Sequence, residues 1–283
     1  MAILIDGKAV SAQIRSELKE EISQLSAKLS RTVGLAVIMV GQDPASAIYV
    51  RNKIKACSEV GIRSYSYPLD ESVSKDEIIS LIQKLNADKN IDGILLQLPL
   101  PKGLDEAEIS AYISDEKDVD GFSAYNVGRL TLGNPTFISC TPYGVLELLK
   151  RYNIAIEGKN AVIVGRSNIV GKPLFHLLLK ENATVTVCHS RTVGLKEILK
   201  GADIVVAAIG KAKFISADMV KEGAVVIDVG INRVDGKVVG DVDFENVKEK
   251  ASYITPVPGG VGPMTITMLL KNTVESARRK ITE

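Results

Sequence analysis

The 283-residue chain contains little of what several classes of protein require. It has no tryptophan, only 5% aromatic residues and a formal net charge of +1, so it lacks the basic surface and the stacking side chains typical of proteins that bind nucleic acids. No apolar run reaches the roughly 18 residues that cross a bilayer, and the N-terminal sequence MAILIDGKAV does not resemble a signal peptide. We therefore expect a soluble, cytoplasmic protein without nucleic-acid or membrane partners.

Cysteine and histidine are also scarce. Cys57, Cys140 and Cys188 are far apart and form no CxxC pair, and the only histidines are His176 and His189. An odd and scattered set of cysteines favours a reducing compartment and argues against a disulfide framework or a structural zinc site. We expect no metal centre.

What the chain does contain is a regular alternation of strand and helix patterns. Hydrophobic runs typical of buried strands occupy residues 33–40, 91–98, 161–164, 184–188, 204–209 and 225–229, and segments with helical periodicity separate them. This alternation predicts an α/β fold with parallel sheets, and the length suits two domains. A weakly periodic segment at 114–135, rich in Asp, Gly and Asn, suggests the region between them.

The most informative segment is NAVIVGRSNIVGKP at residues 160–173. A buried strand meets a glycine turn at Gly165, and Gly171 then opens an amphipathic helix. Such an arrangement binds a dinucleotide pyrophosphate through unpaired amides and the positive end of the helix. The segment departs from the usual GxGxxG pattern, because Ser167 replaces the second glycine and Gly171 stands one position late. An ordinary glycine turn between a strand and a helix is the alternative interpretation.

The residues after the next strand favour NADP over NAD. An NAD site usually has an acid there, about 20 residues after the loop, that bonds the ribose hydroxyls. Here that strand ends in Cys188, His189, Ser190 and Arg191, with no acid. A carboxylate would repel a 2′-phosphate, whereas a hydroxyl and a guanidinium accept it. Arg166, inside the glycine loop, is a second cation within reach.

Tyr49 and Lys53 lie four residues apart on a helix predicted at 45–60, so they share one face. Such a pair can place an aromatic platform beside an ammonium group that handles protons. Because Arg51 and Lys55 flank it, a solvated basic face is the simpler interpretation on spacing alone.

Three further segments carry groups suited to a ligand. Gln97 ends an otherwise apolar strand, where open α/β sheets bind ligands, although bonding to loop backbone explains it equally well. Asp118 and Asp120 lie in KDVDGF, for which turn formation is the default explanation. The loop TPVPGGVGP at 255–263 is stiff, and its backbone can approach a flat ring closely.

Taken together and in order, these segments resemble a known family. Six segments closely resemble the motifs of the bifunctional methylenetetrahydrofolate dehydrogenase/methenyltetrahydrofolate cyclohydrolase family. They are SAIYVRNKIKACSEVGI, GILLQLPLP, KDVDGF, CTPYGV, GRSNIVGKP and PVPGGVGPMT. The resemblance extends from about residue 34 to 270, and six motifs in a fixed order are far more specific than any one. Departures are Ser139, where proline is common, and Ser123-Ala124, where His-Pro is frequent; both bear on local loop shape.

The resemblance implies an α/β fold of two domains. The first is a folate-binding catalytic domain at 1–138, completed by a C-terminal helix at 264–283 that packs back on it. The second is a Rossmann-type, parallel-sheet domain at 139–263 that binds NADP. The resemblance also implies a homodimer.

The resemblance further implies two reactions: NADP-dependent oxidation of 5,10-methylenetetrahydrofolate to the 5,10-methenyl form, then hydrolysis to 10-formyltetrahydrofolate. Lys53 matches the catalytic lysine, Tyr49 an aromatic that stacks on folate, Gln97 a glutamine that orients the lysine, and Asp120 an acid that bonds the pterin. Further substrate contacts are expected from Leu98, Pro258, Gly259, Gly260, Val261 and Gly262. The residues expected to hold the dinucleotide are Gly165, Arg166, Ser167, Ser190 and Ile231, with Arg191 added by the charge argument above.

Three alternatives stay open at this point. A monofunctional dehydrogenase of the same family would be favoured by loss of the lysine, and Lys53 is present. A non-catalytic dinucleotide-binding regulator would need no Tyr–Lys pair. Another two-domain dehydrogenase, acting on a hydroxy acid, would need a His or a Lys–Asp pair near the nucleotide, and the two histidines have no obvious partner in the sequence.

Overall fold

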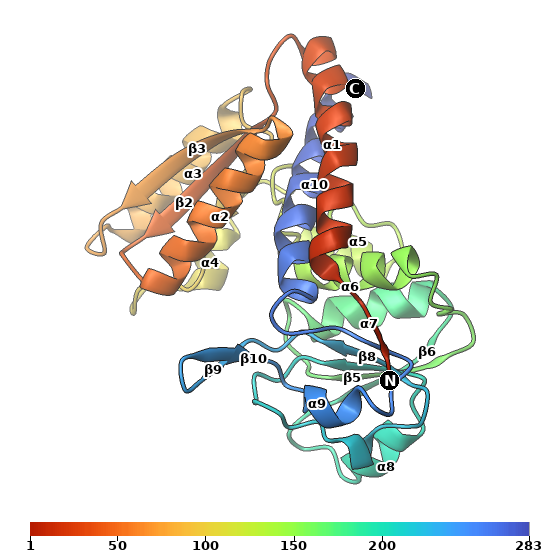
Figure 1. Cartoon of the computed structure of the whole chain (residues 1–283). Coiled ribbons are helices and arrows are strands. Elements are labelled where there is room, and N and C mark those ends of the chain that lie inside the picture. The colour runs from red at the N-terminus through yellow and green to blue at the C-terminus, as the bar shows by residue number, and fades with distance from the viewer. Residues whose placement is uncertain (283) are drawn as a thin grey trace. The chain divides into compact units, whose positions relative to one another are not determined.

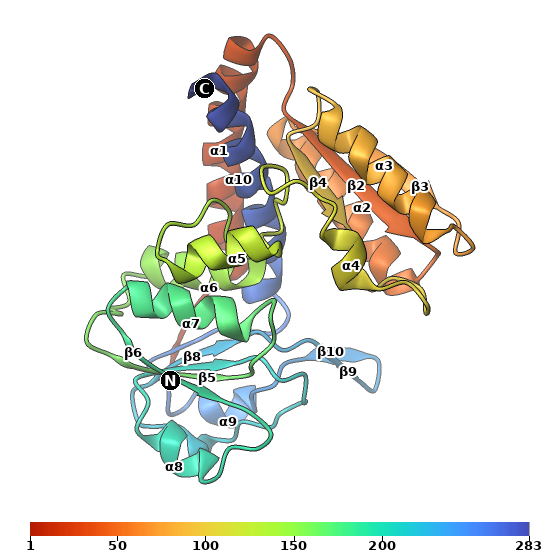
Figure 2. The same ribbon diagram turned by 180° about the vertical axis from the view of Figure 1, so that it is seen from behind.

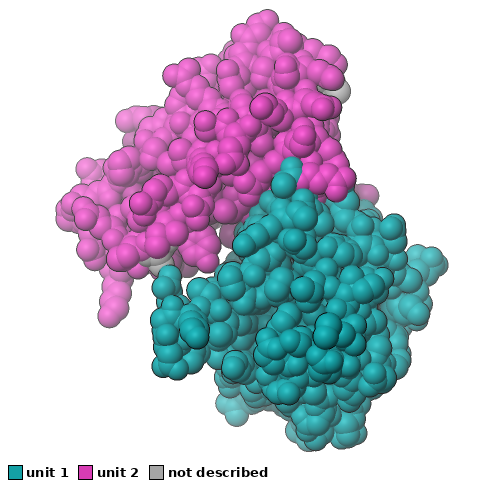
Figure 3. All heavy atoms as spheres, in the orientation of Figure 1, with its two compact units in different colours: residues 1–12, 139–265 teal, residues 13–138, 266–283 magenta. Residues whose placement is uncertain are grey.

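A computed structural model describes residues 1–282 and divides the chain into two compact units. Unit 1 contains residues 1–12 and 139–265, and unit 2 contains residues 13–138 and the chain from residue 266 onward. Figure 1 labels the elements and Figure 3 colours the two units. Each unit has its own parallel sheet with helices packed on it, so the predicted α/β class is confirmed.

Unit 1 is built on a six-stranded sheet in which every pairing is parallel. In spatial order its strands are β1 (Ile3–Leu4), β11 (Tyr253–Ile254), β8 (Val225–Asp228), β7 (Ile204–Ala207), β5 (Asn160–Val164) and β6 (Thr184–Cys188). The chain passes from β5 to β6 on one side of β5 and then crosses to β7 on its other side. Loops at the carboxyl ends of strands diverge at such a point and leave a crevice for a ligand.

Helices cover both faces of this sheet (Figures 1 and 2). One face carries α6 (Cys140–Arg151) and α7 (Gly171–Lys180); the other carries α8 (Leu195–Lys200), a 3₁₀ turn (Ala217–Met219) and α9 (Phe244–Val247). On the second face, Leu199 and Val247 pack into a buried aliphatic core with Val205 and Val226 of the sheet. A hairpin of β9 (Asn232–Val234) and β10 (Lys237–Val239) turns at Asp235-Gly236, as the sequence predicts.

The first twelve residues belong to unit 1. Ile3 of β1 pairs with Tyr253 of β11, and the Ile5 N–H donates to the Ile254 carbonyl at 2.8 Å. The family resemblance assigns these residues to the domain at 1–138, and a strand of two residues has no hydrophobic pattern that would indicate otherwise. Backbone pairing with a strand near the other end of the sequence decides their place.

Unit 2 contains a three-stranded parallel sheet in the order β3 (Arg63–Leu69), β2 (Gly34–Val40) and β4 (Gly93–Leu96). Its shorter helices are α2 (Pro44–Val60), α3 (Lys75–Ala87), α4 (Glu106–Ser110) and α5 (Ala124–Thr131). Ser74 and Glu77 form the predicted capping box of α3, and Ile78, Ile82 and Leu85 then pack on the sheet. Residues 114–135, where weak periodicity suggested a region between domains, lie inside unit 2.

Two long helices, α1 (Gly7–Leu29) and α10 (Val261–Thr282), each begin in unit 1 and continue in unit 2. Their unit 2 portions lie side by side (Figures 1 and 2), and Arg15 Nε donates to Thr267 Oγ1 at 3.0 Å. Asn272 of α10 donates from Nδ2 to the Val119 carbonyl at 2.8 Å. The predicted packing of the C-terminal helix on the first domain is therefore confirmed. None of the described helices is both long and apolar enough to cross a membrane.

Candidate active site

The glycine turn after β5 is as tight as the sequence predicts. Gly165 is buried with φ +139°, and its N–H donates to the Cys188 carbonyl at 2.9 Å. A Cβ at this position would lie 2.2 Å from the Ala208 carbonyl oxygen, so only glycine fits. The turn therefore brings the backbone at the ends of three adjacent strands close together.

The departure from GxGxxG has a structural explanation. α7 begins at Gly171, whose missing side chain allows it to approach the turn: a Cβ there would lie 2.1 Å from the Gly165 carbonyl oxygen. Ser167 Oγ accepts hydrogen bonds from the N–H groups of Val170 at 3.1 Å and Gly171 at 3.4 Å. Gly171 thus provides the close packing of turn and helix, while Ser167 stabilises the loop that leads into the helix.

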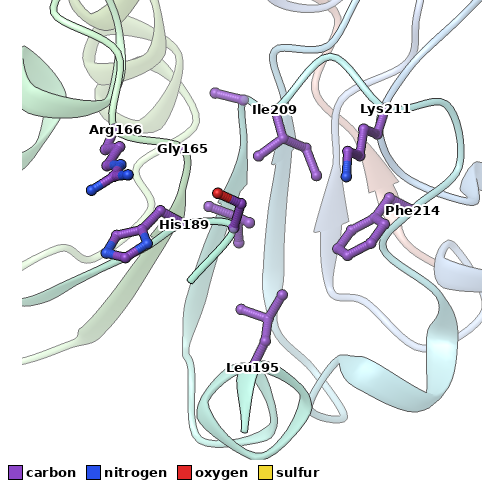
Figure 4. A pocket seen from close by; sticks show the side chains of 10 residues that line it. Gly165, Arg166, His189, Leu195, Ile209, Lys211 and Phe214 are labelled. Atoms are coloured by element: carbon purple, nitrogen blue, oxygen red, sulfur yellow. The ribbon is translucent and has the colours of Figure 1, made fainter. Parts of the chain in front are cut away.

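A pocket of about 290 Å³ lies within unit 1 at the carboxyl ends of β5, β6 and β7. It is lined by Val164, Gly165, Arg166, His189, Ser190, Leu195, Ala208, Ile209, Lys211 and Phe214. In Figure 4 the side chains of Arg166 and His189 lie on one side and those of Ile209, Lys211 and Phe214 on the other. Mostly apolar walls with cations beside them suit a ligand that combines a flat ring with phosphate groups.

The sequence predicts residues on one side of this pocket but not those on the other side. Gly165, Arg166 and Ser190 were expected; Ile209, Lys211 and Phe214, which follow β7, were not. The rule that open α/β sheets bind ligands beyond the carboxyl ends of their strands points to this segment. It does not tell which side chains turn inward, because that depends on the path of the loop.

The other predicted dinucleotide residues lie outside the lining of this pocket. Ser167 is exposed in the loop before α7. Arg191 is exposed in a turn closed by its own N–H donating to His189 Nδ1 at 3.1 Å. Ile231, between β8 and β9, is 52% exposed. These three positions are therefore accessible to parts of a ligand that extend beyond the pocket.

In unit 2 the structure joins two of the predicted catalytic side chains. Lys53 Nζ donates to Gln97 Oε1 at 3.0 Å, across 44 residues of sequence. Gln97 Nε2 in turn donates to the Leu98 carbonyl at 2.6 Å, which directs the amide oxygen toward the lysine. Tyr49 lies one helical turn before Lys53 on α2 and is 42% exposed. An aromatic face and an oriented ammonium group are thus presented by one helix.

Comparison with its neighbours separates Lys53 from a simple basic surface. The Lys55 side chain is 78% exposed, and its ion pair with Glu59 is loose, at 4.0 Å. Lys53 is only half-buried and is held by an amide. Cys57, one turn further along α2, is buried, and burial raises the pKa of its thiol to about 12 even though Lys53 opposes the shift. The thiol is therefore protonated at neutral pH and is no candidate nucleophile.

The predicted acid Asp120 lies on a firmly held turn of unit 2. Asp118 accepts hydrogen bonds from the Ser123 N–H at 2.7 Å and from Asn126 Nδ2 at 2.9 Å. Burial raises the pKa of Asp118, and the hydrogen bonds from Asn126 and Ser123 oppose that shift. Asp118 therefore has the structural role that its sequence suggested, and Asp120, half-buried, is carried by the turn that Asp118 fixes.

The glycine-rich loop at Pro258–Gly262 belongs to unit 1. Its first part is anchored by the Lys8 N–H donating to the Gly259 carbonyl at 3.1 Å and by the Gly260 N–H donating to the Pro256 carbonyl at 2.8 Å. Val261 begins α10. The structure therefore places this loop in the same unit as the pocket, and Tyr49, Lys53, Gln97, Leu98 and Asp120 in unit 2.

These features define a class of protein. One unit carries a parallel sheet with a glycine turn and a pocket suited to a dinucleotide, and the other carries an oriented lysine beside an aromatic side chain; this is the arrangement of a two-domain α/β dinucleotide-dependent enzyme. Residues 5–120 match the family model of the tetrahydrofolate dehydrogenase/cyclohydrolase catalytic domain, and residues 139–281 match that of its NAD(P)-binding domain. The chain belongs to the tetrahydrofolate dehydrogenase/cyclohydrolase family.

Similar proteins span the whole chain. The bifunctional protein FolD of Agathobacter rectalis is 60% identical over 280 residues, covering 99% of this chain and 100% of that protein. The bifunctional FolD enzyme of Campylobacter jejuni has a crystal structure with a TM-score of 0.97 and 53% identity, covering 99% of this chain and 100% of that one. The FolD structure of Trypanosoma brucei, complexed with NADP cofactor and inhibitor, has a TM-score of 0.95 and 40% identity, covering 100% and 99%.

Proposed function

We propose that this protein is a bifunctional enzyme of one-carbon metabolism. It oxidises 5,10-methylenetetrahydrofolate with NADP to the 5,10-methenyl form and then hydrolyses that form to 10-formyltetrahydrofolate. The observation that carries the second activity is the hydrogen bond of 3.0 Å between Lys53 Nζ and Gln97 Oε1. It occurs in a chain that is 60% identical to a bifunctional relative over nearly its full length.

The lysine suits the proton transfers that hydrolysis needs. A water that attacks the methenyl carbon must lose a proton, and a ring nitrogen must gain one before the ring opens. An ammonium group has three N–H donors, and the bond to Gln97 fixes the direction of one of them. Because Gln97 is itself held by the Leu98 carbonyl, the lysine is positioned before substrate arrives. In this proposal Tyr49 stacks on the folate and Asp120 bonds the pterin.

The residues of unit 1 fit NADP. A Cβ at Gly165 would lie 2.2 Å from the Ala208 carbonyl oxygen, so the turn packs tightly against the segment that follows β7. We assign the pyrophosphate to the loop from Gly165 to Ser167 and the adenosine end to Ser190, with Ile231 at the exposed rim. When bound, NADP accepts the hydride. The Trypanosoma brucei relative is described with NADP, and no acid follows β6 to repel a 2′-phosphate.

The proposed preference for NADP over NAD rests on Arg166 and Arg191. Both are exposed cations in the loops that follow β5 and β6. A guanidinium binds phosphate with charge-assisted hydrogen bonds.

We also propose a homodimer in the cytoplasm. The resemblance to the family supports the dimer. Cys57, Cys140 and Cys188 are buried in the described chain and form no disulfide, which supports a reducing compartment. Light scattering coupled to size exclusion measures the assembly, and a monomer at working concentration contradicts this part of the proposal.

The two activities are tested by separate assays on one preparation. Formation of NADPH follows the oxidation, and loss of methenyltetrahydrofolate absorbance follows the hydrolysis. We expect Lys53→Met to lower hydrolysis by about 100-fold or more, in the range of a lost acid–base group, and to leave NADPH binding near the wild-type value, because Lys53 lies in unit 2. Lys55→Met, an exposed lysine on the same helix, is the matched control and should retain both activities.

The alternatives give different results in the same assays. A wild-type protein that oxidises the folate without hydrolysing the product is a monofunctional dehydrogenase. A wild-type protein that binds NADPH and acts on neither folate is a regulator. Loss of NADPH affinity in Lys53→Met contradicts the assignment of the lysine to the folate-binding unit.

A further inference from the structure

Three consecutive backbone amides at the edge of the pocket point at one buried carboxylate. The N–H groups of Ile209 and Gly210 donate to Asp241 Oδ2 at 2.7 and 2.9 Å, and the N–H of Lys211 donates to Oδ1 at 2.8 Å. Successive amides that converge in this way form a nest, a backbone arrangement that binds anions. Here the anion is supplied by the chain itself.

Asp241 is completely buried and its carboxylate is fully used. Besides the three amides, Asn232 Nδ2 donates to Oδ1 at 2.9 Å, so four N–H groups share the two oxygens. The chain makes room for it: a Cβ on Gly230 would lie 2.3 Å from Asp241 Cγ. The backbone N–H of Asp241 donates to Asp228 Oδ1 at 2.9 Å, which fixes the carboxylate from behind. The carboxylate is therefore held on every side by the protein's own donors.

The groups that Asp241 holds are parts of the nucleotide site. Ile209 and Lys211 line the pocket, and Asn232 follows Ile231, which lies at its proposed rim. One carboxylate therefore ties the loop after β7 to the start of β9. Neither segment has a helix or a long strand to hold it, because β7 ends at Ala207 and β9 has three residues.

We propose that Asp241 is a positioning residue of the dinucleotide site, an inference that rests on the proposed function. By filling the nest at Ile209–Lys211 with the protein's own charge, it fixes the second wall of the pocket. It also removes a competing anion site, so that the pyrophosphate is left with the loop from Gly165 to Ser167. The contact is made to backbone, and it acts on nucleotide binding through the loop.

A positioning role and a purely structural role predict different results. Loss of general stability would weaken every activity in proportion. Loss of positioning weakens nucleotide binding and spares hydrolysis of methenyltetrahydrofolate, which needs no nucleotide. An emptied nest should also accept a small carboxylate from solution, since its amides still converge.

The experiment measures the Kd of NADPH by fluorescence titration, and the kcat/KM of hydrolysis, for Asp241→Asn, Asp241→Ala and Asp243→Asn. Asp243 is the matched control: it is two residues further on, and its half-buried carboxylate accepts a hydrogen bond from Asn246 Nδ2 rather than from the loop after β7. Both Asp241 variants should bind NADPH at least about tenfold more weakly, because this is the effect of leaving one buried donor unpaired. Their kcat/KM of hydrolysis should stay at the wild-type value, and Asp243→Asn should keep both the wild-type Kd and the wild-type kcat/KM. Sodium formate should restore part of the affinity of Asp241→Ala, and sodium chloride at equal ionic strength should not.

Each other outcome overturns the inference. Wild-type NADPH affinity in Asp241→Asn means that the carboxylate does not position the loop. An equal fractional loss of hydrolysis means that its role is structural. If formate restores no NADPH affinity in folded Asp241→Ala, then the loss of the anion from the nest does not explain the weaker binding. A wild-type protein that binds no NADPH contradicts the proposed function itself, and the titration of the wild type separates that case from the others.

Discussion

Adding one methyl group at Gly165 tests whether the tight turn after β5 shapes the nucleotide site. In Gly165→Ala the new Cβ would lie 2.2 Å from the Ala208 carbonyl oxygen, whereas ordinary contact begins at 3.4 Å. One of the two groups must therefore move by about 1 Å. The backbone φ of +139° is also one that residues with side chains rarely adopt.

The strands cannot absorb this movement. Val164 pairs with Cys188 on one side and Ala207 on the other, and the Ala208 N–H donates to the Val164 carbonyl at 2.8 Å. The loop that begins at Gly165 must therefore move, and backbone strain there costs about 1–3 kcal/mol. We expect the Kd of NADPH to rise by about 10- to 100-fold, equivalent to about 1.4–2.8 kcal/mol.

The assay is a fluorescence titration of NADPH with wild type, Gly165→Ala and Gly158→Ala. Gly158 precedes the same strand and also has a positive φ, +71°, but a Cβ there would meet no described atom within 4 Å. It therefore carries backbone strain without a contact at the pocket. Unchanged hydrolysis in Gly165→Ala confirms that unit 2 is intact. NADPH affinity within about twofold of wild type in Gly165→Ala, or an equal loss in Gly158→Ala, refutes the reasoning.

Two further predictions concern charge. Replacing Arg166 and Arg191 together by alanine should narrow the preference for NADP over NAD, since each charge-assisted hydrogen bond is worth about 1.5–3 kcal/mol; an unchanged ratio of kcat/KM for the two cofactors rules out the phosphate-binding role. Asp92→Asn should lower the free energy of unfolding in urea by about 3 kcal/mol, the lower end of the range for breaking a buried ion pair, because the buried carboxylate loses its ion pairs with the partly exposed side chains of Arg31 and Lys280. Burial raises the pKa of Asp92, but hydrogen bonds from these two cations outweigh it and lower the pKa below 3.8. The wild type should therefore lose this stability as the pH falls through the lowered pKa, and Asp92→Asn should lack that loss.

Much of the fold follows from local patterns in the sequence. Alternating strand and helix patterns predict parallel sheets because each element must bury an apolar side against the next. Three smaller features are also predictable from local sequence, because each depends on the backbone preferences of a few neighbouring residues. They are the capping box at Ser74, the hairpin turn at Asp235 and the glycine turn at Gly165. The same applies to Tyr49 and Lys53, which share a face through helical spacing alone.

The contacts that turn these elements into a site depend on tertiary structure. The sequence by itself determined the two α/β halves, the glycine turn after β5 and the family. The bond from Lys53 to Gln97, the second pocket wall after β7 and the nest filled by Asp241 were decided only when the strands took their order and register. The physical reason is that periodicity reports which side of an element is buried, whereas the partner of a side chain is set by whichever element packs there. A buried carboxylate such as Asp241 therefore shows no local signal of the loop that it holds.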